Sequence, residues 1–259
     1  SLVNVNAIRE KGYKVVVDAV NSTGGIAVPM LLYSLGVEVV KLYCEPTGLF
    51  PHNPEPLKEH LSVLSQQVVK EKADFGIVVD PDVDRLAFVD ETGEMFGEEY
   101  TLVSCADFVL THTPGNTVSN LSSTRALADI TRSKGGQYFA SAVGELNVVE
   151  KMKTENAVIG GEGNGGIIYP ELHYGRDALV GIALFLSLLT EKEIKVSNLK
   201  ASYPVYTMSK AKVVLSPDVD VDRLLQLMED KYKDKNPITI DGIKTVSYTH
   251  LTLPTTKQV

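Results

Sequence analysis

The stretch Gly76-Ile77-Val78-Val79-Asp80-Pro81-Asp82-Val83-Asp84-Arg85 joins a short apolar run to three closely spaced acidic residues. An apolar run of this length is typical of a buried strand. Pro81 lacks a backbone donor, so the sheet ladder is expected to stop there and leave the acidic residues on a strand-end loop. In extended backbone, alternate side chains share one side. Asp80, Asp82 and Asp84 are therefore predicted to converge on one point.

The charge of this acidic loop indicates a bound cation. Three carboxylates and Arg85 leave a local formal charge of about −2, which is unfavourable without compensation by a cation or by water. Hard oxygen ligands on such a loop suit Mg²⁺ better than Zn²⁺. The sequence thus predicts a magnesium site, with a solvated acidic turn as the alternative that the pattern alone leaves open.

Strand and helix patterns alternate around the acidic loop. Residues 1–9 are predicted to be a connection without a helix. Strands are predicted at 14–20, 37–42, 74–79 and 86–90, and helices at 26–35 and 57–72. A strand–helix–strand unit implies parallel strands with right-handed crossovers. Residues 1–95 are therefore predicted to form one three-layer α/β domain.

Two other loops of this domain contain residues that can bind ligands. Asn21-Ser22-Thr23-Gly24-Gly25 can cradle a phosphate, but it matches neither GxGxxG nor GxxxxGK, so a plain strand-to-helix turn is the favoured interpretation. Residues 47–56 are rich in proline and must be irregular. His52, within them, is either a substrate contact or a surface turn residue.

The same alternation recurs after residue 95. Helices are predicted at 96–112, 122–132, 147–152 and 178–190, and strands at 115–120, 137–140 and 157–160. Residues 96–206 are predicted to form a second domain of the same architecture. The expected fold class is thus α/β, with two successive three-layer α/β/α domains and mixed, mainly parallel sheets. The last strand leads into a glycine-rich loop, Gly161-Glu162-Gly163-Asn164-Gly165-Gly166.

The pattern changes beyond about residue 204. A strand at 212–215, a helix at 217–231 and an incomplete hairpin at 238–244 predict a partial α+β piece over 207–246. The second PDVD, at 217–220, lacks a preceding strand and is interpreted as a helix start, capped by Ser216, rather than a metal site. Residues 247–259 are Thr-rich and aperiodic, and we interpret them as a non-native tail.

Composition narrows the function classes. The chain is 44% hydrophobic and 22% charged, with a net charge of −8 and a pI near 5.2. This balance disfavours nucleic acid and anionic membranes as partners. Cys44 and Cys105 are far apart and are predicted to be buried free thiols. No signal peptide opens the sequence and the longest apolar run is too short for a bilayer, so a cytoplasmic location is expected.

Together, the two loops resemble those of the α-D-phosphohexomutases. DPDVDR is similar to that family's Mg²⁺ loop, and GEGNGGIIYP to its sugar-selecting loop in phosphoglucosamine mutases of archaeal or Bacteroidetes type. NSTGG, GLFPHNPEP and SAVGELNVVEKM resemble connecting segments of the same family. The resemblance runs from about residue 10 to 245 and corresponds to the second, third and beginning of the fourth of four domains. The chain is therefore expected to be a fragment.

The resemblance implies a role for each loop. It assigns Mg²⁺ to three carboxylates: Asp80, Asp82 and Asp84. It assigns sugar binding to four residues: Gly161, Glu162, Gly163 and Asn164. Arg85 would lie beside the phosphate of a phosphoserine from the first domain. The implied reaction isomerises hexose 6-phosphate and 1-phosphate through hexose 1,6-bisphosphate. Glucosamine phosphate is the expected substrate. Gly166 stands where many members carry His, so glucose phosphate and mannose phosphate are alternative substrates.

Departures from the family pattern matter for activity. The Thr-Ala-Ser-His-Asn-Pro type loop with the phosphorylated serine and the Arg-Ser-Gly-Thr-Glu-Pro type phosphate clamp do not occur in this sequence. The chain alone is therefore expected to be inactive. One alternative is a haloacid-dehalogenase-like phosphatase with Asp80 as nucleophile, disfavoured because Arg85-Leu86 follow Asp84 where Thr or Val is expected. Another is a non-enzymatic Mg²⁺ or sugar-phosphate binding module.

Overall fold

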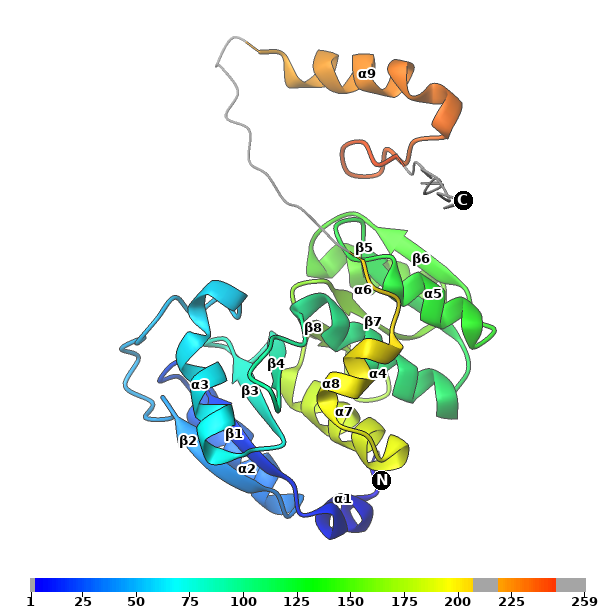
Figure 1. Ribbon diagram of the computed structural model, residues 1–259. Helices are drawn as coiled ribbons and strands as arrows, with labels where there is room; N and C mark the ends of the chain where they lie inside the picture. The colour runs from blue at the N-terminus through cyan, green and yellow to red at the C-terminus, as the bar shows by residue number, and fades with distance from the viewer. Residues whose placement is uncertain (1–2, 207–218, 246–259) are drawn as a thin grey trace, which may run out of the picture. The chain divides into compact units, whose positions relative to one another are not determined.

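The computed structural model describes residues 3–206 and 219–245. The chain forms two compact units, residues 1–208 and residues 209–259. The first unit contains two four-stranded sheets, and Figure 1 shows helices around both of them. The predicted fold class is confirmed: both sheets are mixed, mainly parallel, and covered by helices.

The first sheet has the strand order β2-β1-β3-β4. Its strands are β1 (Lys14–Asp18), β2 (Glu38–Leu42), β3 (Phe75–Val79) and β4 (Leu86–Asp90). The first three strands are parallel, whereas β4 runs antiparallel to β3, with Val79 opposite Leu86. The hairpin between β3 and β4 therefore carries the acidic loop at the carboxyl end of β3.

The second sheet repeats this topology as β6-β5-β7-β8. Its strands are β5 (Asn116–Asn120), β6 (Tyr138–Ser141), β7 (Ala157–Glu162) and β8 (Gly166–Ile168). Here β5, β6 and β7 are parallel, and β8 returns antiparallel to β7. The glycine loop thus occupies the same hairpin position in the second sheet that the acidic loop occupies in the first.

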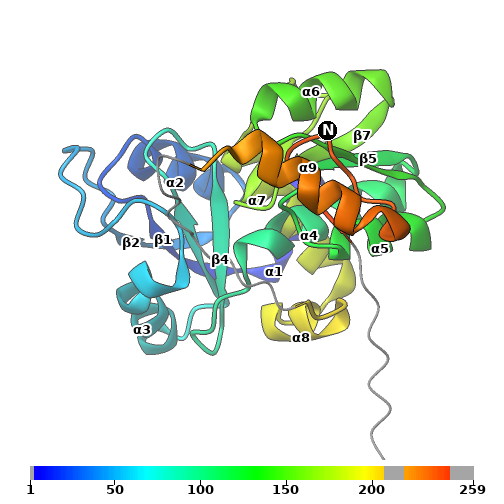
Figure 2. The same ribbon diagram turned by 90° about the horizontal axis from the view of Figure 1, so that it is seen from above.

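Crossover helices cover both faces of each sheet. In the first sheet α2 (Gly24–Ser34) joins β1 to β2, and α3 (Ser62–Glu71), after the short η1 (Lys58–His60), joins β2 to β3. Because the chain reverses direction across the sheet between these crossovers, right-handed connections place α2 and α3 on opposite faces, as Figure 2 shows. In the second sheet, α5 (Ala126–Ser133) and α6 (Glu145–Thr154) make the corresponding crossovers.

Two helices are shared by the sheets. α4 (Glu98–His112) and α7 (Ala178–Lys192) lie between them in Figure 1, and one hydrophobic core runs from the first sheet through both helices to the second. Phe185 of α7 stacks on Phe88 with ring centroids 3.8 Å apart. It also makes edge-to-face contacts with Phe75 and Phe96 at 5.6 and 5.4 Å. The relative placement of the two sheets therefore rests on apolar burial around α7.

Some elements differ from the sequence predictions. Residues 1–9 were predicted to lack a helix, but α1 spans Val5–Lys11. The Asn4 side chain caps its start by accepting a hydrogen bond from the amide of Ala7 at 3.1 Å, and Gly12 ends it with φ 64°. β8 and α8 (Val196–Ser202) were not predicted. α5 begins at Ala126 rather than Ser122, because residues 121–125 form a turn first.

In the second unit, α9 spans Val221–Lys231 and a short η2 spans Lys233–Lys235. The helix starts later than the predicted residue 217, because Val219 and Asp220 are not helical and the Asp220 side chain caps the helix at the amide of Arg223. Ser216, Pro217, Asp218 and the strand predicted at 212–215 lie outside the described residues. The predicted hairpin is a single antiparallel bridge between Ile238 and Lys244.

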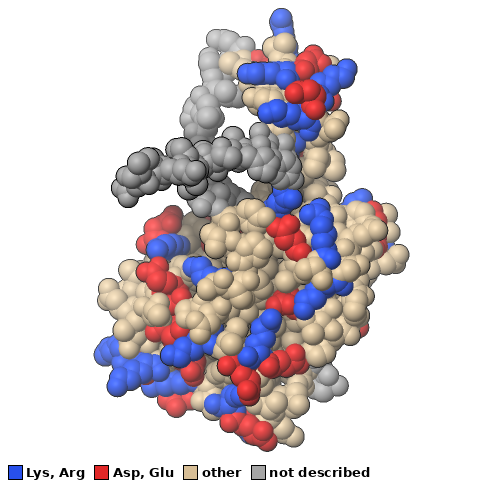
Figure 3. Space-filling model, turned by 45° about the vertical axis from the view of Figure 1, so that its right-hand side comes forward, with Lys and Arg blue, Asp and Glu red and all other residues tan. Residues whose placement is uncertain are grey.

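The surface carries charged side chains of both signs. Basic and acidic side chains are interspersed over the face drawn in Figure 3. Over residues 3–206 and 219–245, no helix combines the length and apolar character needed to cross a membrane.

Cys44 and Cys105 are both buried free thiols, as predicted, and burial raises the pKa of Cys44 to about 11.

Phe185→Ala is expected to lower the free energy of unfolding by about 3–5 kcal/mol, because it opens a cavity where the two sheets share their core. Chemical denaturation followed by circular dichroism measures this loss. Phe50→Ala is the matched control: Phe50 is 46% exposed, and its removal should change the stability by less than about 0.5 kcal/mol. Equal effects of the two substitutions would contradict the assignment of Phe185 to the shared core.

Candidate functional site

The acidic loop and the glycine loop contact each other directly. The amide of Leu86 donates to the carbonyl of Gly165 at 3.1 Å, and Arg85 and Gly166 form an isolated antiparallel bridge. The amide of Ala178, the first residue of α7, donates to the carbonyl of Val83 at 3.0 Å. The two strand-end loops are more than 70 residues apart in the sequence, but these hydrogen bonds hold them side by side.

The acidic loop is a turn, and the alternation argument for its carboxylates was wrong. Residues 81–83 form a turn and a bend rather than extended backbone, and Val83 adopts a left-handed conformation with φ 63°. That conformation is unfavourable for a β-branched residue, by about 1–3 kcal/mol. The hydrogen bond from Ala178 holds the carbonyl of Val83 in place. The carboxylates converge because the chain turns around them.

Asp80 organises the turn. Its Oδ1 accepts hydrogen bonds from the amides of Asp84 and Arg85 at 3.1 and 3.0 Å, and only 4% of the residue is exposed. Its Oδ2 lies 3.3 Å from Nε of Arg85. The guanidinium of Arg85 also lies 3.8 Å from a carboxylate oxygen of Glu55 in the Pro-rich loop. Arg85 is thus anchored at the acidic loop.

The three carboxylates fit a hard divalent cation. One oxygen each of Asp80, Asp82 and Asp84 lies within 4.8 Å of the others. Oδ1 of Asp84 is buried and has no hydrogen-bond partner among the described residues. Burial, followed by the neighbouring carboxylate of Asp80, raises the pKa of Asp84 to about 7. Oδ1 of Asp84 lies 3.9 Å from Nε of Arg85. A cation bound by these oxygens would reduce the repulsion between the carboxylates and would coordinate the oxygen that lacks a hydrogen bond.

Glu162 lies at the end of β7 and is only 5% exposed. Its Oε1 accepts hydrogen bonds from Nδ2 of Asn120 at 2.7 Å and from the amide of Gly144 at 3.3 Å. Asn120 ends the neighbouring strand β5, so the parallel sheet brings the two side chains together. The sequence analysis did not predict Asn120, although its position at a strand end next to β7 was a usable signal.

The glycines of the loop allow close packing within the protein. A Cβ on Gly163 would lie 2.3 Å from a carboxylate oxygen of Glu99. Gly165 has φ +92°, and a Cβ there would lie 2.2 Å from the carbonyl oxygen of Leu86. At Gly161, which has φ +155°, a Cβ would lie 2.0 Å from the Gly166 carbonyl oxygen. Oδ1 of Asn164 accepts from the Gly166 amide at 3.2 Å, closing the turn.

Arg176 is a site residue that the sequence analysis missed. It immediately precedes Asp177, whose side chain caps α7 at the amides of Leu179 and Val180. Its guanidinium pairs with Asp84 of the acidic loop and with Glu162 of the glycine loop. The sequence does show an arginine just before the cap of a long helix. It does not show which carboxylates this arginine pairs with, because that depends on how the two sheets pack.

The loop Asn21–Gly25 lies beside the acidic loop. The hydroxyl of Thr23 donates to the carbonyl of Pro81 at 3.1 Å. Asp18 is the last residue of β1, the strand that leads into this loop. It is 1% exposed, and its Oδ2 lies 3.0 Å from Nε2 of His52. This contact anchors the Pro-rich loop, so His52 is a half-buried residue rather than a surface turn residue.

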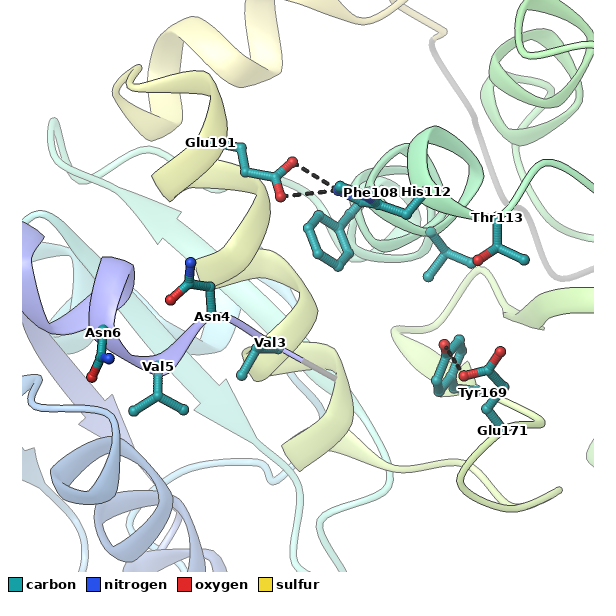
Figure 4. Close-up of a pocket in the computed structure, with 11 residues that line it drawn as sticks. Val3, Asn4, Val5, Asn6, Phe108, His112, Thr113, Tyr169, Glu171 and Glu191 are labelled. Atoms are coloured by element: carbon teal, nitrogen blue, oxygen red, sulfur yellow. Dashed lines mark hydrogen bonds and ion pairs between the residues drawn. The ribbon is translucent and has the colours of Figure 1, made fainter. Parts of the chain in front are cut away.

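A cavity lies elsewhere in the first unit. It has a volume of about 700 Å³ and is lined by α1 and the residues just before it, by α4 and α7, and by the segment after β8 (Figure 4). His112 and Glu191 pair there at 2.9 Å, and Tyr169 donates to Glu171 at 2.9 Å. None of the predicted site residues lines it, so cavity volume and site chemistry point to different places.

Comparisons with known proteins match both sheets of the first unit to one family. Residues 1–93 match the alpha/beta/alpha domain II of the phosphoglucomutase/phosphomannomutase family, and residues 97–206 match its alpha/beta/alpha domain III. A phosphoglucomutase/phosphomannomutase of Thermococcus kodakarensis is 35% identical over 94% of this chain and 54% of its own length. A probable phosphoglucosamine mutase of Methanopyrus kandleri is 32% identical over 90% of this chain and 52% of its own length.

The fold comparison gives the same result. The crystal structure of a phosphoglucomutase/phosphomannomutase family protein from Burkholderia thailandensis has a TM-score of 0.75 and 28% identity, covering 93% of this chain and 54% of that one. The chain spans about half the length of the curated relatives it matches.

The His52–Asp18 pair predicts a pH dependence of stability. The hydrogen bond to Asp18 raises the pKa of His52 above its ordinary value of 6.5. Because the folded-state pKa is the higher one, the pair stabilises the protein fully below pH 6.5, and this contribution is lost as the pH rises through the raised pKa. His52→Gln should therefore destabilise the chain more at about pH 6 than at about pH 9.

Thermal unfolding across this pH range measures the difference. His60→Gln, in η1, is the matched control and should leave the pH dependence of stability unchanged. A pH-independent effect of His52→Gln would contradict a charged pair with Asp18.

Proposed function

The chain belongs to the α-D-phosphohexomutase family, and on that premise we propose that it supplies the metal and sugar loops of an enzyme interconverting hexose 6-phosphate and hexose 1-phosphate. Residues 1–95 would be the family's second domain, 96–206 the third and 207–246 the start of the fourth. The observation that carries this proposal is the direct hydrogen bonding of the acidic loop to the glycine loop.

Asp80, Asp82 and Asp84 would hold the Mg²⁺. When bound, the ion would act as a Lewis acid that neutralises charge on the transferred phosphoryl group. The buried Oδ1 of Asp84, which accepts no hydrogen bond from the described residues, supports this role. Arg85, anchored by Asp80, would place its planar donor fork beside the phosphate, where charge-assisted hydrogen bonds orient the group for in-line transfer.

Glu162 and Asn164 would bind the sugar hydroxyls, with backbone groups of Gly161 and Gly163 beside them. The Glu162 carboxylate is held in one orientation by Asn120 and Gly144, which suits an acceptor that must recognise one arrangement of hydroxyl groups. Asn164 uses its oxygen within the loop, which leaves its amide nitrogen as the donor for a hydroxyl. Glucosamine phosphate is the proposed substrate, in line with the phosphoglucosamine mutase name of the Methanopyrus relative.

The phosphoryl donor would be a phosphoserine outside this sequence, and hexose 1,6-bisphosphate would be the intermediate and activator of the full-length enzyme. By itself, the 259-residue chain would bind metal and sugar phosphate without turnover. A phosphatase using Asp80 as nucleophile is disfavoured, because both oxygens of Asp80 already contact donors, namely two backbone amides and the Arg85 guanidinium.

Asp82→Asn is expected to weaken Mg²⁺ binding about tenfold or more, because it removes a charged ligand from an exposed position of the turn without touching the core. Isothermal titration calorimetry measures the affinity. Asp220→Asn, in the second PDVD, is the matched control: asparagine caps a helix as well as aspartate does, so fold and Mg²⁺ affinity should stay unchanged. Equal Mg²⁺ affinity in the wild-type chain and Asp82→Asn would refute the metal assignment.

Glu162→Gln should weaken binding of glucosamine 6-phosphate about tenfold, because a neutral amide is a poorer acceptor for the sugar hydroxyls. The same titration with glucosamine 6-phosphate measures this loss. Turnover by the wild-type chain with Mg²⁺ and glucose 1,6-bisphosphate should be undetectable by phosphorus NMR. Measurable isomerisation would show that the chain carries its own phosphoryl donor.

A further inference from the structure

The side chain of Arg176 joins the acidic loop to the glycine loop. One terminal nitrogen pairs with Oδ2 of Asp84, and the other lies 3.1 Å from Oε2 of Glu162. Its Nε lies 3.3 Å from Oε2 of Glu145, at the start of α6. The Arg176 side chain is 17% exposed. A guanidinium stays charged and presents its donors in one plane, so these three contacts have a fixed geometry.

The neighbouring backbone leaves room for this side chain. A Cβ on Gly166 would lie 2.4 Å from Cδ of Arg176, so any larger residue at position 166 would displace the arginine. Arg176 itself bridges to Ile168 of β8, and the amide of Asp177 donates to the carbonyl of Ile167 at 2.9 Å. The position of the guanidinium is therefore fixed by the hairpin and by the start of α7.

The charges around Arg176 are unbalanced. Three carboxylates, from Asp84, Glu162 and Glu145, share one guanidinium. Oδ2 of Asp84 is paired with Arg176, whereas its Oδ1 is buried without a hydrogen-bond partner among the described residues and lies 3.9 Å from Nε of Arg85. A divalent cation bound at Oδ1 would add further positive charge at this carboxylate, beyond Arg176 and the more distant Arg85, so it would weaken the pairing of Asp84 with Arg176.

We propose that Arg176 is a positioning residue that serves as the internal counter-ion of the metal site. Without metal it pairs with Asp84 and Glu162 together. When a divalent cation binds Asp84, the guanidinium remains with Glu162 and Glu145 alone. Occupancy of the acidic loop thereby changes the restraint on the sugar-binding carboxylate, which couples the two sites. This inference rests on the proposed magnesium site and adds how that site communicates with the sugar loop.

Titration of MgCl₂ into the metal-free chain tests the counter-ion role. Arg176→Gln should bind Mg²⁺ about fivefold or more tightly than the wild-type chain, because the competing cation is gone. Arg132→Gln, a 58% exposed arginine on α5, is the matched control and should not change the affinity. Unchanged or weaker binding by Arg176→Gln overturns the inference alone. Absence of Mg²⁺ binding by the wild-type chain overturns the metal site and this inference with it.

A second variant tests the same role in a way that does not depend on whether Arg176→Gln folds. Gly166→Ala keeps every charge and displaces only the arginine side chain. It should also bind Mg²⁺ more tightly, with thermal unfolding confirming that the chain is folded. Wild-type affinity in a folded Gly166→Ala would count against the counter-ion role.

Nitrogen-15 NMR tests the coupling itself. The Gly144 amide and the side-chain amide of Asn120 both donate to Oε1 of Glu162 and so report on that carboxylate. Their signals should shift during Mg²⁺ titration of the wild-type chain, with the same dissociation constant as the signals of the acidic loop. In Arg176→Gln these two shifts should disappear while those of the acidic loop remain. Persistence of the shifts in Arg176→Gln would overturn the coupling.

Discussion

The burial of α7 between the two sheets is the constraint on which the rest of the structure depends. Phe185 packs among three aromatic rings of the first sheet and its flanking loop, and the same helix is continuous with the core of the second sheet. This packing fixes where α7 begins. Ala178 then donates to the carbonyl of Val83, and Arg176 reaches the acidic loop. Apolar burial thus positions the groups of the candidate site.

The site concentrates negative charge that the fold must compensate. Asp80 and Glu162 are buried, and each is held by amide donors and one arginine. Asp84 is the exception: its pKa rises to about 7, and one of its oxygens lacks a hydrogen-bond partner in the described part of the chain. Unsatisfied groups of this kind are rare in cores but common where a ligand completes the environment. The strained φ of Val83 lies in the same turn.

Most strands and helices could be predicted from the sequence, because β-branched runs and helical periodicity are local signals. The apolar run before Asp80 marked the end of β3 correctly. The glycine-rich run marked the end of β7 less closely, because β7 continues two residues into it, to Glu162. The local signals failed where distant contacts decide the structure. β8 has three residues and exists because it pairs with β7, and the Asp84–Arg176 pair exists because two sheets share α7. The convergence of the carboxylates was predicted for the wrong reason, since Val83 turns the chain.

We propose that the acidic loop and the glycine loop form one site for a metal ion and a hexose phosphate. The most direct measurement is a crystal structure of the chain with Mn²⁺ and glucosamine 6-phosphate, using the anomalous signal of manganese. We predict one anomalous peak coordinated by Asp80, Asp82 and Asp84, with sugar density against Glu162 and Asn164. A metal peak away from these carboxylates, or a sugar bound far from the glycine loop, would contradict the account.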